Sequence, residues 1–361
     1  MSKRKIGILT SGGDCPTLNA TIRGAVLSLY RHYGEDNIEI IGIHDGFQGL
    51  IHDNCKVMNP GDFCGFLTRG GTALGSKRTP FKMMREIEAD GIDKVQRMKN
   101  TYNNQRFDCI LAFGGNGTHK NTNLLFEEGL NVIALPKTID NDINGTDVTF
   151  GFHTAVEVGT EAIDRIHTTA HSHNRVMVVE IMGNKSGFLS LYTGVAGGSN
   201  LILVPEIPYS EDIVIETVKK RADAGEPYSI IVAAEGALDI SESLMKKKDL
   251  AKKRTDAGET TVTNRLVKAI QEKTGIESRA AVPGYMLRGG TPSAYDRVLA
   301  TQFGARAAQL IEAGQFGYTV AKKGVEITEN KLSDIVGKPR QLDLGDSLIQ
   351  TARKIGISFG D

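Results

Sequence analysis

Two carboxylates and a glycine-rich turn lie close together in the stretch from Cys109 to Asn144, and together they could transfer a phosphoryl group. The turn is Gly114 to Thr118, and the carboxylates are Asp140 and Asp142, two positions apart in the segment PKTIDND. One carboxylate of such a pair can take a proton from a substrate hydroxyl while the other helps to hold a metal ion. An Asx-type turn, in which the aspartates bind only their own backbone, is the alternative interpretation.

Residues around this acidic pair have the types that bind phosphate. Thr138 can donate a hydrogen bond to a phosphate oxygen, and Lys137 can neutralise its charge. In the turn GGNGT, backbone without Cβ can approach phosphate oxygens closely, and the helix that follows offers unpaired N–H groups. The candidate donor-binding residues of this turn are Gly114, Gly115, Asn116, Gly117 and Thr118.

Two further segments have the composition of phosphate-binding loops. The turn TSGGD contains Gly13 and precedes a segment with helical spacing, so it repeats the arrangement of GGNGT. The segment RGGTALGSKR ends at Arg78 and combines two glycine turns with three cations. Tight strand-to-helix connections and a solvated basic loop remain the alternatives for these segments.

Short apolar runs separated by helix-length segments are expected to form the strands that position these loops. The runs are Lys5–Thr10, Ile38–Ile43, Cys109–Phe113, Val132–Leu135, Val176–Ile181, Leu201–Val204 and Ile230–Ala234. Their alternation with helical segments favours an α/β fold with mostly parallel sheets. Ligands of such sheets bind beyond the carboxyl ends of the strands, where the polar loops of this chain are predicted to lie.

Composition limits the classes of function. A length of 361 residues favours two or three domains. Lys+Arg and Asp+Glu balance at 43 each, so no overall field argues for nucleic acid as a partner. No apolar run approaches the roughly 20 residues of a membrane helix. The four cysteines lack metal-ligand spacing and no secretory signal precedes them, so we expect free thiols and a cytoplasmic protein.

The motifs, taken in order from Ile8 to Ala307, closely resemble those of the phosphofructokinase family. They are ILTSGGDCPTLNATIRG, GIHDGFQGL, RGGTALGSKR, GGNGT, PKTIDNDI, MGNKSG, AAEGA and ESRAAVPGYMLRGGTPSAYDRVLATQFGARA. The resemblance implies two stacked three-layer α/β domains with mostly parallel sheets. One, residues 1–150 plus about 287–335, would bind the donor ATP, and the other, 151–286 plus about 336–361, would bind fructose 6-phosphate.

The resemblance also implies an activity and a role for each candidate residue. The family phosphorylates the 1-hydroxyl of fructose 6-phosphate, with Mg²⁺ as cofactor, in glycolysis. Asp140 resembles its catalytic base, Thr138, Asp142 and Lys137 lie beside it, and Gly13 and Arg78 fall where the donor's phosphates are held. Asn116 and Asp142 are the candidate metal ligands. The candidate sugar phosphate residues are Arg175, Met182, Gly183, Asn184, Glu235, Arg279, Tyr285 and Arg288.

Sites shared between subunits are a further implication of the resemblance. Arg175 and Arg279 match arginines that the family lends across a subunit interface. We therefore expect a homodimer or homotetramer with active sites shared across an interface, and ATP or pyrophosphate and fructose 6-phosphate as partners, with neither nucleic acid nor membrane.

Two positions give opposite indications about the phosphoryl donor. Gly117 resembles the glycine that leaves room for the α-phosphate of ATP, where pyrophosphate enzymes carry aspartate. Lys137 resembles the lysine of pyrophosphate enzymes and of a mixed group of ATP enzymes. Because a steric block discriminates more firmly than an additional cation, ATP is the favoured donor and pyrophosphate the alternative.

Three positions depart from the family pattern at the chemistry itself. Asn116 replaces an aspartate that supports Mg²⁺, and an amide oxygen is a neutral ligand where Mg²⁺ usually takes carboxylates. Asn184 replaces an arginine that helps to stabilise the transferring phosphoryl group. Tyr285 replaces a histidine and can still donate a hydrogen bond to the sugar's phosphate. Asn116 and Asn184 together motivate a second alternative, a catalytically weak regulatory subunit of the same family.

Other histidines and motifs are assigned no catalytic role. His167, His171 and His173 lack a carboxylate or cysteine at metal-ligand spacing, so we expect them to pack at the surface or at an interface. His119 opens the helix after GGNGT and is expected either to touch the donor or to face solvent. A dehydrogenase is disfavoured because no GxGxxG opens a helix with an acidic residue at the next strand.

Overall fold

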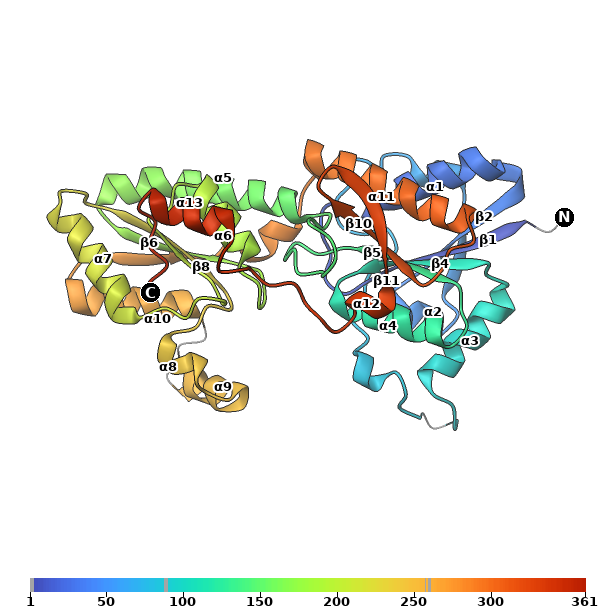
Figure 1. Ribbon diagram of the computed structural model, residues 1–361, viewed down its shortest axis with the longest axis horizontal. Coiled ribbons are helices and arrows are strands. Elements are labelled where there is room, and N and C mark those ends of the chain that lie inside the picture. The colour runs from blue at the N-terminus through green and yellow to red at the C-terminus, as the bar shows by residue number, and fades with distance from the viewer. Residues whose placement is uncertain (1–2, 88–89, 257, 259–260) are drawn as a thin grey trace. The chain divides into compact units, whose positions relative to one another are not determined.

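The computed structural model describes residues 3–87, 90–256, 258 and 261–361 (Figure 1). Contacts divide the chain into two compact units. Unit 1 is Met1–Thr154 with Arg288–Arg340, and unit 2 is Ala155–Leu287 with Gln341–Asp361. Both units combine helices with mainly parallel strands, so the α/β class predicted from the sequence is confirmed. Which ligand each unit binds stays a prediction.

Unit 1 is built on one sheet whose described strands number seven, in the order β11-β10-β5-β4-β1-β2-β3. The strands are β1 (Arg4–Ser11), β2 (Ile38–Ile43), β3 (Cys55–Met58), β4 (Cys109–Gly114), β5 (Val132–Pro136), β10 (Tyr318–Lys323) and β11 (Glu326–Lys331). The five inner strands run parallel, and β3 and β11 are antiparallel edges. Strands covered on both faces are often nearly continuous apolar runs, which is why β1, β2, β4 and β5 could be found from the sequence. The inner strand β10, YTVAKK, was not expected.

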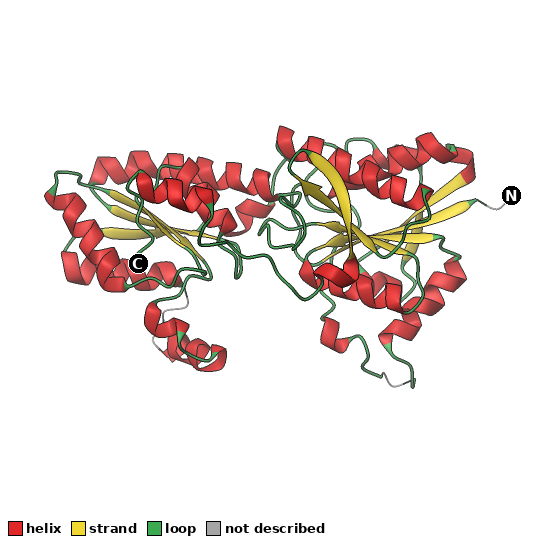
Figure 2. Cartoon of the chain, viewed as in Figure 1, coloured by secondary structure: helices red, strands yellow, loops and turns green. Residues whose placement is uncertain are grey.

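Helices cover both faces of this sheet (Figure 2). They are α1 (Leu18–Tyr33), α2 (Phe47–Ile51), α3 (Lys94–Gln105), α4 (Asn116–Glu127), α11 (Ala294–Glu312) and α12 (Leu332–Ile335), with 3-10 turns at Glu35–Asn37, Pro60–Phe63 and Phe81–Met83. Helices α1 and α11 touch backbone to backbone, because a Cβ on Gly304 would lie 2.4 Å from the amide nitrogen of Ala25. This contact fixes α1, which begins just after the TSGGD turn.

Unit 2 contains a smaller sheet, with four parallel strands in the described part of the chain, in the order β7-β8-β6-β9. They are β6 (Val176–Ile181), β7 (Leu201–Leu203), β8 (Ser229–Ala234) and β9 (Ser278–Ala281). The helices are α5 (Phe152–His173), α6 (Phe188–Ala196), α7 (Glu211–Asp223), α8 (Ile240–Ser243), α9 (Lys247–Asp256), α10 (Val262–Thr274) and α13 (Ser347–Lys354), with a 3-10 turn at Gly284–Arg288. Buried aliphatic side chains of β6, β7, β8, α7 and α10 form the core. No described helix in either unit is both long enough and apolar enough to cross a membrane.

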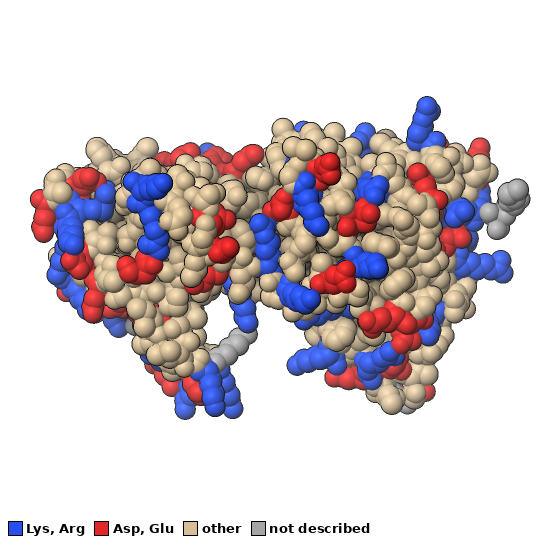
Figure 3. Space-filling model, in the orientation of Figure 1, with Lys and Arg blue, Asp and Glu red and all other residues tan. Residues whose placement is uncertain are grey.

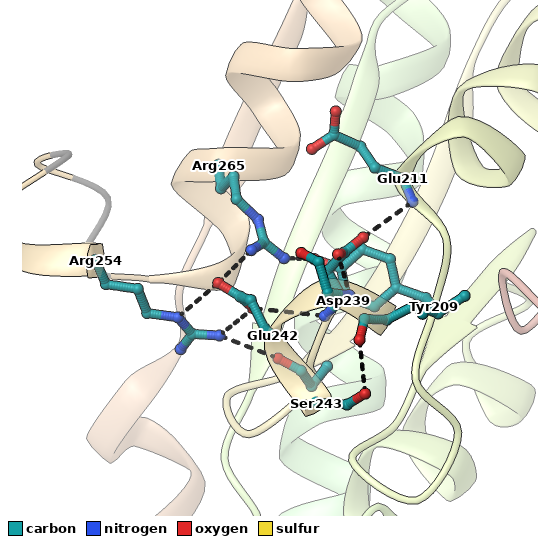
Figure 4. Close-up of polar contacts among 10 residues, drawn as sticks. Tyr209, Glu211, Asp239, Glu242, Ser243, Arg254 and Arg265 are labelled. Atoms are coloured by element: carbon teal, nitrogen blue, oxygen red, sulfur yellow. Dashed lines mark hydrogen bonds and ion pairs between the residues drawn. The ribbon is translucent and has the colours of Figure 1, made fainter. Parts of the chain in front are cut away.

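The basic segment after α8 forms an excursion from unit 2, as its charge and turn residues predict. Four lysines of the excursion are exposed: Lys246, Lys248, Lys252 and Lys253. Figure 3 shows cations clustered on the excursion. Glu242, whose side chain is completely buried, bonds the excursion to the rest of unit 2. Glu242 accepts hydrogen bonds from Arg254 of α9, with Nη2 to Oε2 at 2.8 Å, and forms an ion pair with Arg265 of α10 (Figure 4).

The Glu242 carboxylate should make the stability of unit 2 depend on pH. Burial alone would raise the pKa of Glu242, but hydrogen bonds from Arg254 and Arg265 outweigh it and lower the pKa to about 2. Its stabilisation is therefore complete above the unfolded-state value of 4.5 and is lost as pH falls toward 2. Glu242→Gln should lower the free energy of unfolding near pH 7 by about 3 kcal/mol, because it leaves two half-buried arginines without their carboxylate.

Urea unfolding of the wild type and of Glu242→Gln near pH 7 and near pH 3 measures this contribution. The difference between the two proteins should narrow at the lower pH. Glu216→Gln is the matched control, because Glu216 pairs with Lys220 only at the surface of α7 and should change stability little. A difference that stays constant between the two pH values would rule out the charge of Glu242 as its source.

Candidate active site

The GGNGT segment joins β4 to α4 in unit 1. Gly114 ends the strand, Gly115 is the N-cap, and Asn116, Gly117 and Thr118 form the first turn of the helix. A side chain at Gly114 is excluded, since its Cβ would lie 2.0 Å from Thr118 Oγ1. The N–H groups of a first helical turn lack intrahelical partners and carry the positive end of the helix dipole, so this turn can bind phosphate.

His119 holds this turn from inside the protein. Its Nδ1 lies 3.0 Å from the carbonyl oxygen of Gly115, and its Nε2 lies 2.9 Å from Thr319 Oγ1 on β10. A carbonyl only accepts, so Nδ1 carries the proton and Nε2 accepts from the threonine hydroxyl. Burial lowers the pKa of His119 to about 4, which keeps the imidazole neutral. The residue does not face solvent, so that expectation was wrong, whereas a contact with the donor stays a prediction.

The basic segment RGGTALGSKR is docked on the TSGGD turn that follows β1. Ser76 Oγ donates to the carbonyl of Gly12 at 2.6 Å, and Ser11 Oγ donates to the carbonyl of Lys77 at 3.2 Å. Asn19, fully buried at the start of α1, donates to the carbonyl of Arg69 at 3.0 Å and accepts from the segment's backbone. These contacts place the exposed Arg78 beside the first glycine turn.

Two cations lie against the same glycine turn. The ammonium group of buried Lys137 donates to the carbonyl of Gly13. Burial lowers the pKa of Lys137, opposed by the nearby Cys15 and Asp140. A Cβ on Gly13 would lie 2.8 Å from Nη1 of Arg288, so the glycine leaves room for that guanidinium. Arg288, which the resemblance assigns to the sugar phosphate, thus belongs to unit 1 and lies among the candidate donor residues.

The acidic turn after β5 is held by uncharged side chains. Thr138 Oγ1 accepts from the backbone N–H of Asp140 at 3.1 Å. Asn141 adopts the left-handed conformation, with φ of 54°, and its Oδ1 accepts from the N–H of Thr149 at 3.0 Å. Thr149 Oγ1 in turn donates to the carbonyl of Thr138 at 2.7 Å. The backbone of the turn therefore has partners other than the two carboxylates.

Asp142 joins the acidic turn to the GGNGT turn. Its Oδ2 accepts from Nδ2 of Asn116 at 2.8 Å, and the same amide also donates to its backbone carbonyl at 3.1 Å. Burial raises the pKa of Asp142, and the hydrogen bond from Asn116 opposes the rise. The two segments that sequence analysis singled out are thus in direct contact within unit 1.

The residues at this contact fit Mg²⁺ as part of a nucleotide complex. Mg²⁺ usually binds through one or two carboxylates together with phosphate oxygens and water. Asp142 supplies a partly buried carboxylate, and Asp140 lies two positions before it in the same turn. No three His, Cys, Asp or Glu residues gather as a metal site among the residues that the structure describes. The ion would therefore need the donor's phosphates to complete its coordination.

The candidate sugar phosphate residues of unit 2 form two groups. At the carboxyl ends of β6 and β8, Glu235 Oε1 accepts from the N–H groups of Gly183 at 3.2 Å and Asn184 at 2.6 Å, next to Met182. At the other end of β6, Arg175 and Arg279 both pair with Glu277. Strand β6 has six residues, so roughly 20 Å separates the groups.

Tyr285 belongs to neither group. It lies in the 3-10 turn Gly284–Arg288, and 80% of its surface is exposed. A side chain so exposed in one copy of the chain is available to a ligand or to a partner.

Sequence reasoning missed several residues that support the site. His119 was not expected to support the turn, and Asn19, Asn141 and Thr149 were not singled out. A polar residue inside an apolar helical pattern, as at Asn19 in α1, is the one signal that could have indicated a buried partner.

Comparisons with known proteins identify the family to which this chain belongs. A family model described as phosphofructokinase matches residues 5–311. The ATP-dependent 6-phosphofructokinase of Spirochaeta thermophila is 50% identical over 99% of this chain and 98% of its own length. ATP-dependent 6-phosphofructokinase 3 of Bacteroides thetaiotaomicron is 43% identical over 99% of this chain and all of its own length (100%).

Two solved structures show the same fold. Phosphofructokinase from Saccharomyces cerevisiae superimposes with a TM-score of 0.77 and 29% identity, over 92% of this chain and 45% of the yeast chain, so this protein spans about half the yeast chain's length. A pyrophosphate-dependent phosphofructokinase from Nitrosospira multiformis has a TM-score of 0.80 over 95% of this chain and 86% of its own. Its identity of 17% supports similarity of fold alone.

Proposed function

Because the chain belongs to the phosphofructokinase family, we propose that it is an ATP-dependent 6-phosphofructokinase. The reaction transfers the terminal phosphoryl group of ATP to the 1-hydroxyl of D-fructose 6-phosphate and yields fructose 1,6-bisphosphate and ADP in glycolysis, in the cytoplasm. The observation that carries this proposal is the contact between Asn116 and Asp142, which brings a phosphate-binding turn onto a pair of carboxylates.

Asp140 acts as the general base of this reaction. It takes the proton of the 1-hydroxyl as that oxygen bonds to the terminal phosphorus, while the bond from phosphorus to the bridging oxygen breaks and ADP leaves with its electron pair. N–H groups of the first turn of α4, with the cations Lys137 and Arg288, stabilise the negative charge on the phosphoryl oxygens. Thr138 donates a hydrogen bond to the same group. When bound by Asp142, Mg²⁺ supplies additional positive charge at the donor's phosphates.

The open space at Gly117 supports ATP as the donor. A Cβ at this position would have no described atom within 4 Å, so the first turn of α4 leaves room beside the terminal phosphates. Relatives named for ATP are 39–50% identical to this chain. Structures named for pyrophosphate are 17–20% identical.

Pyrophosphate remains the second candidate donor because of Lys137. Its buried ammonium group lies at the TSGGD turn. Pyrophosphate has no nucleoside with which to contact the protein, so its binding would depend more on this cation than the binding of ATP would. The third candidate, a catalytically weak regulatory subunit, is favoured by the amides of Asn116 and Asn184. Asp140, Lys137 and Arg288 argue against this candidate, since a base and two phosphate-binding cations are present.

A homo-oligomer is part of the proposal. Arg175 and Arg279 lie at the end of β6 opposite Gly183 and Glu235, too far away to share one sugar phosphate with them. The two arginines can instead serve the site of a second copy, in a homodimer or a homotetramer.

Phosphorus NMR of the products tests the activity. Purified protein with fructose 6-phosphate, ATP and Mg²⁺ should produce ADP and a second phosphomonoester resonance on carbon 1 of the sugar. A new phosphate on any other carbon, or no ADP beyond that formed without sugar, would contradict the proposal.

A further inference from the structure

The loop that follows the acidic turn, residues 143–149, is bound by the hairpin of β10 and β11. The N–H of Asp147 donates to the carbonyl of Lys322 at 2.8 Å, and its Oδ2 accepts from the N–H of Gly324 at 2.6 Å. Asn330 Nδ2 donates to the carbonyl of Gly145 at 2.8 Å. The hairpin lies next to β5, the strand that leads into the turn (Figure 1).

Arg340 adds one bond to the acidic turn and one to the loop that follows it. Its backbone N–H donates to the carbonyl of Asp142 at 2.8 Å. Its guanidinium Nη1 donates to the carbonyl of Asp147 at 2.7 Å. The hairpin and Arg340 lie after residue 311, so they fall outside the part of the chain that the family model matches.

The carbonyl of Asp147 links Arg340 to the residue between the two carboxylates. This carbonyl accepts from Nδ2 of Asn141 at 3.3 Å as well as from Arg340. Asn141 separates Asp140 from Asp142 and has a left-handed backbone, which asparagine tolerates better than most residues other than glycine. Its side chain is fixed between Asp147 on one side and the N–H of Thr149 on the other.

We propose that Arg340 is a positioning residue for phosphoryl transfer, which holds Asp147 so that Asn141 keeps Asp140 and Asp142 in their reactive orientation. This inference rests on the function proposed above for Asp140. Without the guanidinium, the carbonyl of Asp147 loses its shorter hydrogen bond, and the amide of Asn141 loses a fixed acceptor. The turn then samples other conformations, in which the base is displaced from the hydroxyl.

The test replaces the guanidinium and measures both the turn and the reaction. Arg340→Gln should lower kcat between roughly 10- and 100-fold, the range expected when a catalytic group is misplaced, with little change in KM for fructose 6-phosphate. Deuterium exchange of the peptide containing Thr149 should become faster, since its N–H bonds to Asn141. Arg340→Lys should recover most of the rate, because one donor suffices for the carbonyl of Asp147.

Arg306→Gln is the matched control. Arg306 of α11 pairs with Glu329 on the same hairpin, and within the described residues no hydrogen bond of these two side chains reaches Asn141 or Asp147. Both kcat and exchange at Thr149 should therefore stay unchanged. Wild-type kcat in Arg340→Gln would overturn the proposal, as would a loss of kcat without faster exchange at Thr149. If the wild type fails to phosphorylate fructose 6-phosphate, the proposed function fails, and the exchange data still decide whether Arg340 holds the turn.

Discussion

Replacing Asp140 by asparagine should lower kcat by about 10²- to 10⁴-fold, the usual contribution of a general base. Asparagine has nearly the same size and cannot accept the proton of the substrate hydroxyl. The backbone of the turn should persist, because Thr138 binds the N–H of residue 140 whatever its side chain. Steady-state rates with saturating ATP and fructose 6-phosphate, together with a thermal unfolding curve, measure the two effects separately.

The same substitution on the surface provides the control for Asp140→Asn. Asp164 is exposed on α5, so Asp164→Asn should keep both kcat and the unfolding temperature of the wild type. If Asp140→Asn retains a rate within a few-fold of the wild type, another group is the base. If its unfolding temperature falls steeply, the loss of rate reflects unfolding and does not assign a role.

Gly117→Asp should reduce kcat/KM for ATP by on the order of 10²-fold or more, because juxtaposed like charges cost several kcal/mol. Its carboxylate would occupy the open space at the start of α4 and would repel the phosphates beyond the terminal one. The variant should fold, since an acidic side chain in the first turn of a helix is stabilising.

Gly117→Asn separates size from charge in this experiment. The amide has nearly the size of the carboxylate and lacks its charge, so it should lose less ATP activity than Gly117→Asp. Initial rates over a range of ATP concentrations give kcat/KM for both variants. If Gly117→Asp uses ATP as well as the wild type does, the phosphates beyond the terminal one do not lie beside position 117, and the open space there does not select ATP.

Most of the parallel core strands, although not β10, were predictable because burial on both faces leaves a continuous apolar run. The expected ranges Ile38–Ile43 and Val176–Ile181 are those of β2 and β6. The edge strands β3, β9 and β11 were not predicted, since a strand exposed at a sheet edge can carry residues such as those of SRAA and EITENK. Their pairing depends on partners distant in the sequence.

Candidate site residues could be named from the sequence, while their supports could not. The motifs around Asp140 and Gly117 are local, so a single stretch of sequence indicates phosphate chemistry. Arg340 bonds to a residue 193 positions away, and no periodicity or motif marks it. His119 likewise contacts Thr319 of β10, and the apolar pattern did not predict this strand. Its burial could therefore not be expected from the sequence. The roles of the individual residues stay predictions.

Comparison of kcat/KM for ATP and for pyrophosphate, each with Mg²⁺ and saturating fructose 6-phosphate, tests the central claim most directly. The open space at Gly117 predicts that ATP has the larger specificity constant, with fructose 1,6-bisphosphate as the product. A larger kcat/KM for pyrophosphate would contradict ATP as the donor and would indicate that Lys137, rather than Gly117, determines which donor is used. Turnover with neither donor would contradict the kinase activity itself.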